Sequence, residues 1–218
     1  MIRGITVAVM AVATVSCGDD GPTAPLTLAQ RSVVNIAAQT CMDPNAHRGI
    51  GVVVTATDGT AVVVTAGHVV EGDLRELIVD ARPATVLAID RNADLAVIDV
   101  DGLDEPPLAL SAIEPAGLIQ MSPASATGVD VTDRERLVVE HLSDHETYRR
   151  DVIAFTPPVV GGMSGSPLVD GQGRIAGVVI LNDDATGEGI AVTADHVRAL
   201  LDTVSNEARE AGDRPGTC

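Results

Sequence analysis

The feature that most constrains the fold of this chain is a series of short apolar segments rich in β-branched residues and separated by turn-forming residues. Two of the boundaries, Asp58-Gly59 and residues 169–175 (VDGQGRI), have the composition of β-hairpin turns. Aromatic residues are almost absent, with one Tyr, one Phe and no Trp, so Val, Ile, Leu and Ala must form the core. Many short strands with such turns predict an all-β domain, either a sandwich or a barrel.

The segments fall into two sets with one helix at the end. We expect strands at 32–37, 49–56, 60–66, 75–80, 84–90 and 94–100, a Pro- and acid-rich connector at 101–117, and strands at 118–122, 125–131, 136–142, 148–155, 166–170, 174–182 and 189–194. Residues 193–209 have apolar residues at helical spacing, which predicts a closing helix. The folded domain is therefore expected over 31–209, followed by a tail at 210–218.

The N-terminus has the pattern of an export signal. Arg3 precedes an uncharged, mostly apolar stretch from Gly4 to Gly18, which is too short for a membrane span. Small residues before Cys17 resemble a bacterial lipoprotein signal, in which residues 1–16 are removed and Cys17 is lipidated. The alternative is ordinary secretion with cleavage after Ala13. Both place the domain outside the cytoplasm, in a bacterial cell envelope or secreted, behind a flexible tether at 17–30.

Charge and cysteine usage narrow the possible partners. The formal net charge is −17, which argues against nucleic acid and against anionic membranes, so any membrane contact is expected through an N-terminal lipid. All 14 basic residues are Arg, which excludes a Ser–Lys dyad and a P-loop lysine. If Cys17 carries lipid, Cys41 and Cys218 remain as a possible disulfide; the alternative is a free Cys218.

Three local patterns could carry chemistry. Ser164 lies in VVGGMSGSPL, where surrounding glycines favour a turn that directs backbone N–H groups at an oxyanion. His68 follows a strand in VVVTAGHVV, and Asp94 opens one in NADLAVIDV. Each pattern alone has an ordinary structural explanation, namely a tight turn, a surface histidine and a turn aspartate.

Together these strings resemble the chymotrypsin/trypsin-like serine proteases. The order His68, Asp94, Ser164 is that of the family, and TAGHVV, NADLAV and GGMSGSPL resemble its histidine, aspartate and serine segments. GIAVTADHVRALL resembles the last strand and helix of the bacterial HtrA-type branch. The resemblance covers about residues 32–205, and no PDZ domain is expected after the helix.

The resemblance implies two antiparallel six-stranded β-barrels with a cleft between them, the first at about 31–100 and the second, with the helix, at 118–209. It implies a serine endopeptidase acting on proteins or peptides, without a metal or another cofactor. Ser164 would be the nucleophile, His68 the general base and Asp94 its orienting partner. The N–H groups of Gly162 and Ser164 would form the oxyanion hole.

Several alternatives remain open beside this prediction. The protein could be a catalytically weak or inactive protease fold that binds peptides. An esterase on another fold would require helices between the strands, and these are missing. Ser166 is a rival nucleophile, although the motif register favours Ser164. His141 and His145 could bind zinc on a helix, but their segment alternates like a strand.

Two departures from better-known relatives bear on activation and specificity. Met163 stands where trypsin-like enzymes place an aspartate that pairs with a freed N-terminus, so activity without zymogen cleavage is expected. Pro158 stands where members specific for Lys and Arg carry an aspartate, so no basic preference is expected. Small or aliphatic P1 residues are expected instead, in a pocket for which Val159, Val178 and Val179 are candidate linings.

Overall fold

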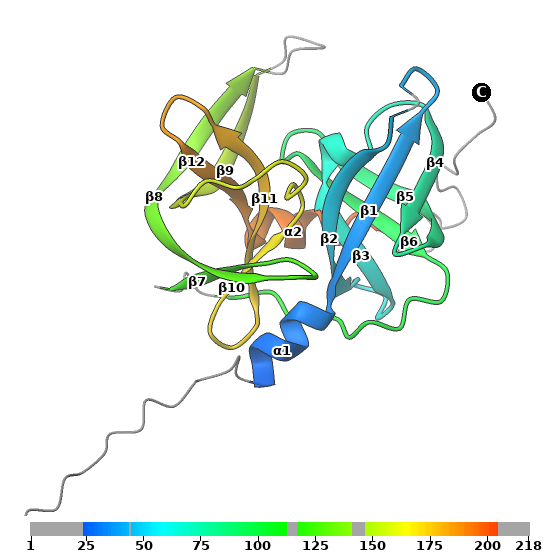
Figure 1. The fold of residues 1–218 in the computed structure, drawn as a ribbon, viewed down its shortest axis with the longest axis horizontal. Helices are drawn as coiled ribbons and strands as arrows, with labels where there is room; N and C mark the ends of the chain where they lie inside the picture. Colours follow the sequence, from blue (N-terminus) through cyan, green and yellow to red (C-terminus); the bar gives the residue numbers. More distant parts are fainter. Residues whose placement is uncertain (1–23, 44, 113–116, 141–146, 205–218) are drawn as a thin grey trace, which may run out of the picture.

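The chain forms two closed β-barrels that lie side by side (Figure 1). This computed structural model describes residues 24–204 except 44, 113–116 and 141–146. All strand pairs in both barrels are antiparallel. The predicted all-β class with two six-stranded barrels and a C-terminal helix is therefore confirmed.

The first barrel has the strand order β1-β2-β3-β6-β5-β4. Its strands are β1 (Val33–Thr40), β2 (His47–Thr55), β3 (Ala61–Ala66), β4 (Leu74–Val79), β5 (Arg82–Asp90) and β6 (Leu95–Val100). The predicted turn at Asp58-Gly59 joins β2 to β3: Gly59 has φ +85°, and the Asp58 carboxylate accepts the N–H of Thr60 at 3.0 Å. A short 3₁₀ helix, η1 (Gly67–Val69), follows β3 directly.

The second barrel has the order β10-β11-β12-β9-β8-β7. Its strands are β7 (Leu118–Met121), β8 (Ala126–Glu140), β9 (Thr147–Thr156), β10 (Pro167–Val169), β11 (Ile175–Asp183) and β12 (Glu188–Thr193). The predicted hairpin at 169–175 joins β10 to β11, with Gly173 at φ +74°. The separate strands expected at 125–131 and 136–142 are one strand, because a register shift between Val131 and Asp133 lets β8 continue through its polar middle.

Helix α1 (Ala24–Arg31) corrects the prediction of a flexible tether for residues 24–30. Pro25 suits the first turn of a helix, and Ala29 is fully buried. Gly173 lies so close to α1 that a Cβ there would be 2.7 Å from the carbonyl oxygen of Pro25. The segment is therefore docked on the domain. Residues 1–23, with the predicted signal peptide and Cys17, lie outside the described residues.

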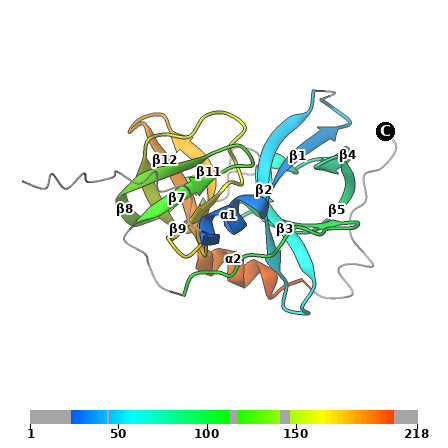
Figure 2. The same cartoon turned by 60° about the horizontal axis from the view of Figure 1, so that its bottom comes forward.

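Helix α2 (Ala194–Leu201) is the predicted closing helix, and it ends earlier than the expected Arg209. Val197, Leu200 and Leu201 are buried, as their spacing predicted. Residues 202–204 have left the helix, and residues 205–218 lie outside the described part of the chain. Figure 2 shows α1 and α2 on the side where the two barrels meet.

One hydrophobic cluster extends across both barrels. It joins the interior of the first barrel to Val152, Ala154 and Val178 of the second barrel and to Val197 of α2. A smaller cluster surrounds Phe155 inside the second barrel. Because the barrels share one packed core, the loops at their junction are held in a fixed relation.

The connector between the barrels also binds to both of them. The N–H of Leu108 donates to Val53 O at 2.9 Å, and Ser111 N donates to Ile175 O at 2.7 Å. These contacts join the predicted connector to β2 on one side and β11 on the other. Within the described residues, no helix is long and apolar enough to span a bilayer.

Candidate active site

His68 and Asp94 meet at two points on the rim of the first barrel. The imidazole Nδ1 lies 2.8 Å from Asp94 Oδ2, and the backbone N–H of His68 donates to Asp94 Oδ1 at 2.8 Å. Gly67 N also donates to the carbonyl oxygen of Asp94 at 2.8 Å. Gly67 eases this close approach, because a Cβ there would be 3.1 Å from Asp94 Oδ1, a tight contact. The carboxylate can therefore fix both the position and the tautomer of the ring.

Asp94 occupies an unusual backbone conformation at the end of the β5–β6 turn. Its φ is +54°, in the left-handed region that Asp tolerates better than most residues. Its side chain is 16% exposed, whereas that of His68 is 45% exposed. The carboxylate is therefore shielded behind the ring, while the imidazole can reach a bound molecule.

The pKa of His68 is raised above its ordinary value of 6.5. Burial opposes the charged ring and lowers the pKa, but the hydrogen bond and negative charge of Asp94 outweigh this effect. The charge of Glu71 raises the pKa further, and that of Arg150 lowers it. Proton uptake by His68 is therefore favoured, as a general base requires.

The Ser164 loop crosses from the second barrel and docks on the first. Ile50 N donates to the carbonyl oxygen of Ser164 at 2.8 Å. Gly165 has φ +86°, and a Cβ there would be 1.9 Å from Ile50 O, 2.3 Å from Thr65 Oγ1 and 3.1 Å from Ala66 N. Ala66 is the N-cap of η1, which carries His68. This packing brings the Ser164 loop to the segment that precedes His68, and it explains why Gly165 cannot carry a side chain.

The Ser164 hydroxyl forms no hydrogen bond with His68 in the part of the chain that the structure describes. Catalytic hydrogen bonds are often long in the absence of substrate and shorten when substrate binds. The structure thus joins two of the three predicted residues directly and brings the third to the adjoining loop.

The predicted oxyanion hole is a turn with two free N–H groups. Gly162 has φ +85°, as the glycine pattern predicted. Met163 N donates to Val160 O at 3.2 Å and Ser166 N to Met163 O at 3.0 Å. Among the described residues, the N–H groups of Gly162 and Ser164 have no acceptor. Both are therefore available to bind an oxyanion.

Ser166 is fully buried behind this turn, unlike Ser164. Its Oγ accepts a hydrogen bond from Gln120 Nε2 at 3.0 Å, and Gln120 is itself 8% exposed. A substrate cannot reach this hydroxyl without opening the second barrel. The Ser166 environment therefore favours the structural role that the motif register indicated.

The predicted apolar pocket lining is wrong for Val178 and Val179. Both side chains are fully buried in the hydrophobic clusters, because β11 is covered on both faces. Val159 is half-buried, and its backbone N–H donates to Asn182 Oδ1 at 2.9 Å. The Asn182 amide also donates to Val159 O. Of the three valines, only Val159 remains a candidate wall.

A cavity of about 680 Å³ adjoins the glycine turn on the side of the first barrel. Gly162 and Met163 of the second barrel line it together with Arg48 and Asp80 of the first. The Asp80 carboxylate accepts from the backbone and side-chain nitrogens of Asn35 at 3.1 and 2.9 Å. The lining residues come from both barrels, so a molecule bound in this cavity would contact both of them.

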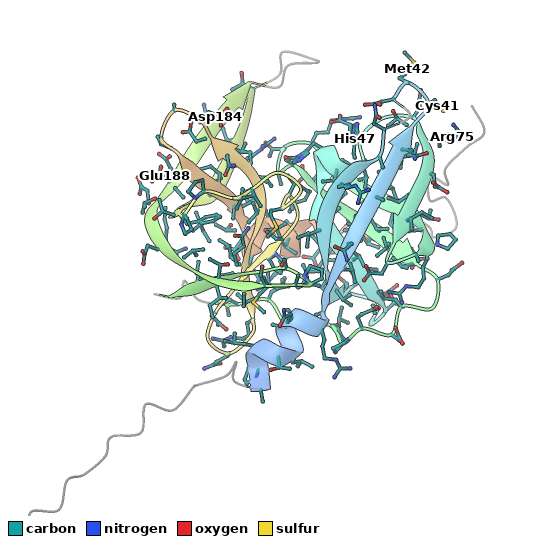
Figure 3. All side chains as sticks on the ribbon, in the orientation of Figure 1. Cys41, Met42, His47, Arg75, Asp184 and Glu188 are labelled. Atoms are coloured by element: carbon teal, nitrogen blue, oxygen red, sulfur yellow. The ribbon has the colours of Figure 1, made fainter. Side chains whose placement is uncertain are left out.

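Of the predicted cysteine sites and the candidate zinc-binding histidines, the structure describes Cys41 alone. Cys41 lies near Met42 and Arg75 at the far end of β1 (Figure 3) and is disulfide-bonded. Cys218 lies outside the described residues, so the predicted pairing stays a prediction. His141 and His145 also lie outside them. Within the described residues, no group of three or more His, Cys, Asp or Glu side chains could hold a metal ion.

Sequence reasoning missed two residues around this site. Gln120 supports Ser166 from β7, and Arg150 of β9 holds the turn before Asp94. The sequence places Arg150 in phase with the apolar Val152 and Ala154, but its partners are distant in the chain and only the structure shows them. The signal for Gln120 was weaker, since a glutamine in a short strand commonly faces solvent.

Comparisons with known proteins agree with this geometry. The profile of the trypsin-like peptidase domain matches residues 49–178. The serine proteases Rv3671c and MT3772 of two Mycobacterium tuberculosis strains are 33% identical over 154 residues, which is 64% of this chain and 38% of each relative. The chain thus spans well under half the length of these curated relatives.

Solved structures show the same architecture. The active form of the Rv3671c protease from M. tuberculosis has a TM-score of 0.73 and 28% identity, over 84% of both chains. The HtrA-type protease AlgW with a tripeptide has a TM-score of 0.61 at 22% identity, over 82% of this chain and 62% of that chain, and therefore shows the fold alone. By its sequence profile and its two paired barrels, the chain belongs to the trypsin-like peptidase domain family.

Proposed function

We propose that the protein is a serine endopeptidase that cleaves peptide bonds through His68, Asp94 and Ser164. The observation that carries this proposal is the two-point contact of Asp94 with His68, together with the glycine turn around Ser164, in which the N–H groups of Gly162 and Ser164 have no acceptor among the described residues. Relatives named serine proteases support the same chemistry.

The proposed reaction begins with attack of Ser164 Oγ on the peptide carbonyl carbon. His68 Nε2 accepts the hydroxyl proton, because a neutral serine is a weak nucleophile. The carbonyl oxygen becomes an oxyanion that accepts hydrogen bonds from the N–H groups of Gly162 and Ser164. His68 then donates its proton to the leaving amine, the C–N bond breaks, and an acyl-enzyme remains.

Deacylation repeats these steps with water. His68 removes a proton from water as the oxygen attacks the ester carbon, and the same two N–H groups stabilise the second oxyanion. Collapse releases the carboxylic acid and returns the proton to Ser164. Throughout, Asp94 holds Nδ1–H and stabilises the imidazolium that forms twice in each cycle.

The proposed setting is outside the cytoplasm. The export-type segment before Gly18 supports this location, and the disulfide at Cys41 is suited to an oxidising compartment. Lipidation of Cys17 would then tether the peptidase to a bacterial membrane. The alternative is ordinary secretion, with signal cleavage after Ala13 and no lipid. Position 158 is a proline and so lacks the carboxylate that would bind a Lys or Arg side chain of the substrate. A preference for small or aliphatic P1 side chains is therefore proposed.

Cleavage of a proteome-derived peptide library tests the proposed activity. The purified protein is expected to produce new peptide ends enriched in small or aliphatic P1 residues, without prior proteolytic activation. Pretreatment with a fluorophosphonate probe should stop this cleavage completely. A protein that binds library peptides yet neither cuts them nor reacts with the probe would instead be a peptide-binding protein.

A further inference from the structure

Arg150 is a buried cation at the junction of the two barrels. It lies in β9 and is 3% exposed. It shares a strand face with Val152 and Ala154, whose side chains belong to the cluster that extends across both barrels. The guanidinium therefore faces the first barrel, and its burial requires partners there.

These partners are main-chain atoms of the turn that leads to Asp94. Arg150 Nε donates to the carbonyl oxygen of Asn92 at 2.5 Å, and an Nη nitrogen donates to the carbonyl oxygen of Arg91 at 3.1 Å. The backbone N–H of Arg149 donates to Asn92 Oδ1 at 3.2 Å. Two adjacent residues of the second barrel thus hold one turn of the first.

The turn itself is restrained on its other side. Ala93 is fully buried, and its N–H donates to Asp90 Oδ1 at 3.1 Å. Asp94 follows at φ +54°, a conformation that persists only when the surroundings determine it. The contacts from β9 are among those surroundings, because they fix the carbonyl groups of Arg91 and Asn92, three and two residues before Asp94.

We infer that Arg150 is a positioning residue that aligns Asp94, and through it His68, with the barrel that carries Ser164. This inference rests on the proposed function. The planar guanidinium suits the task, because its donors lie in a fixed fork and can bind two successive carbonyl oxygens at once. A lysine ammonium carries the same charge on one compact group and lacks the planar fork that sets the direction of both bonds.

The positive charge of Arg150 also supports catalysis, through its effect on the pKa of His68. Asp94 and Glu71 raise the pKa of His68, and Arg150 opposes them. Glu71 is itself paired with Arg91, at 3.0 Å between Nε and Oε1. Arg150 therefore favours the neutral ring, which is the form that can accept a proton from serine.

Three variants separate these roles. In Arg150→Met, kcat for peptide hydrolysis is expected to fall about 10- to 100-fold with little change in KM, because misplaced catalytic groups slow the chemical step. The acid limb of the pH profile of kcat should move to higher pH, because loss of the positive charge raises the pKa of His68.

Arg150→Lys keeps the charge, so it should leave the acid limb in place while kcat remains below that of the wild type. Arg149→Met is the matched control and should behave as wild type, since among the described residues Arg149 is hydrogen-bonded to the turn through its backbone N–H alone.

A proton NMR measurement reads the His68–Asp94 contact without any turnover. The low-field resonance of the His68 Nδ1 proton is expected to broaden or vanish in Arg150→Met and to persist in Arg149→Met. If Arg150→Met does not fold, Arg150→Lys replaces it in both measurements. An unchanged kcat and resonance would overturn the inference, as would a loss confined to KM or an equal loss in Arg149→Met.

The failure of this inference can be told from failure of the proposed function. If the wild type neither cuts peptides nor reacts with a fluorophosphonate, the proposed function fails, and the resonance still decides the role of Arg150. If the wild type is active and Arg150→Met keeps its kcat and resonance, the positioning role alone is wrong.

Discussion

Replacement of Ser164 by Ala is expected to lower kcat for peptide hydrolysis by about 10⁴- to 10⁶-fold and to abolish labelling by a fluorophosphonate probe. The reason is that Ser164 would supply the atom that attacks the carbonyl carbon, whereas its neighbour Ser166 is fully buried. Rates of hydrolysis and the mass of the labelled protein measure the two effects. The protein should remain folded, because Ser164 is only partly buried and its side chain forms no hydrogen bond among the described residues.

Ser166→Ala is the matched control for this prediction. The variant should still react with the probe, because Ser166 is fully buried. It should lose about 1–3 kcal/mol in the free energy of unfolding, since Gln120 Nε2 would lose its acceptor inside the barrel. Denaturant titration measures this loss. Labelling that survives in Ser164→Ala and disappears in Ser166→Ala would move the nucleophile to Ser166.

Asp94→Asn is expected to lower kcat by about 10⁴-fold while leaving the fold intact. An amide can still accept the backbone N–H of His68, but it cannot stabilise the imidazolium or select the tautomer that leaves Nε2 free. The pH profile should change as well. Asp94 raises the pKa of His68, so activity of the wild type rises with pH through that raised value. Loss of the carboxylate lowers the pKa, and the acid limb should move to lower pH.

Comparison of Glu71→Gln with Asp94→Asn separates the effect of a nearby negative charge on His68 from the effect of direct contact with the ring. Glu71 also raises the pKa of His68, but it acts through its charge without touching the ring. This variant should therefore shift the acid limb slightly to lower pH and keep kcat near that of the wild type. A large loss of kcat in Glu71→Gln, or none in Asp94→Asn, would contradict the role given to Asp94.

The strands and their turns could be predicted because their causes are local. Alternating β-branched segments and the Asp58-Gly59 turn determine hairpins over a few residues, and the structure has those hairpins. The continuity of β8 could not be predicted in this way. A polar run such as Asp133–Arg136 looks like a turn, but pairing with β9 carries the strand through it. Helix α1 was missed for a related reason, since its order comes from docking beside Gly173.

In the candidate site, too, the residues with a local sequence signal could be predicted, and those that depend on distant contacts could not. His68, Asp94 and Ser164 stand in strings whose residue order is informative, and glycine at 162 and 165 has the positive φ that the turn requires. The prediction for Val178 and Val179 was wrong because the covering of both faces of β11 depends on the second barrel as a whole. Arg150 depends on contacts between residues 58 and 59 positions apart, which no local pattern contains.

A crystal structure of the protein with a covalently bound peptide aldehyde tests the central claim most directly, because the adduct resembles the tetrahedral intermediate. We predict a bond from Ser164 Oγ to the aldehyde carbon, with the oxygen about 2.7–3.1 Å from the N–H nitrogens of Gly162 and Ser164. His68 Nε2 should lie within hydrogen-bonding distance of Ser164 Oγ, with its contact to Asp94 retained. An adduct on another residue, or one in which His68 stays apart from Ser164 and the oxygen faces away from both N–H groups, would contradict the account.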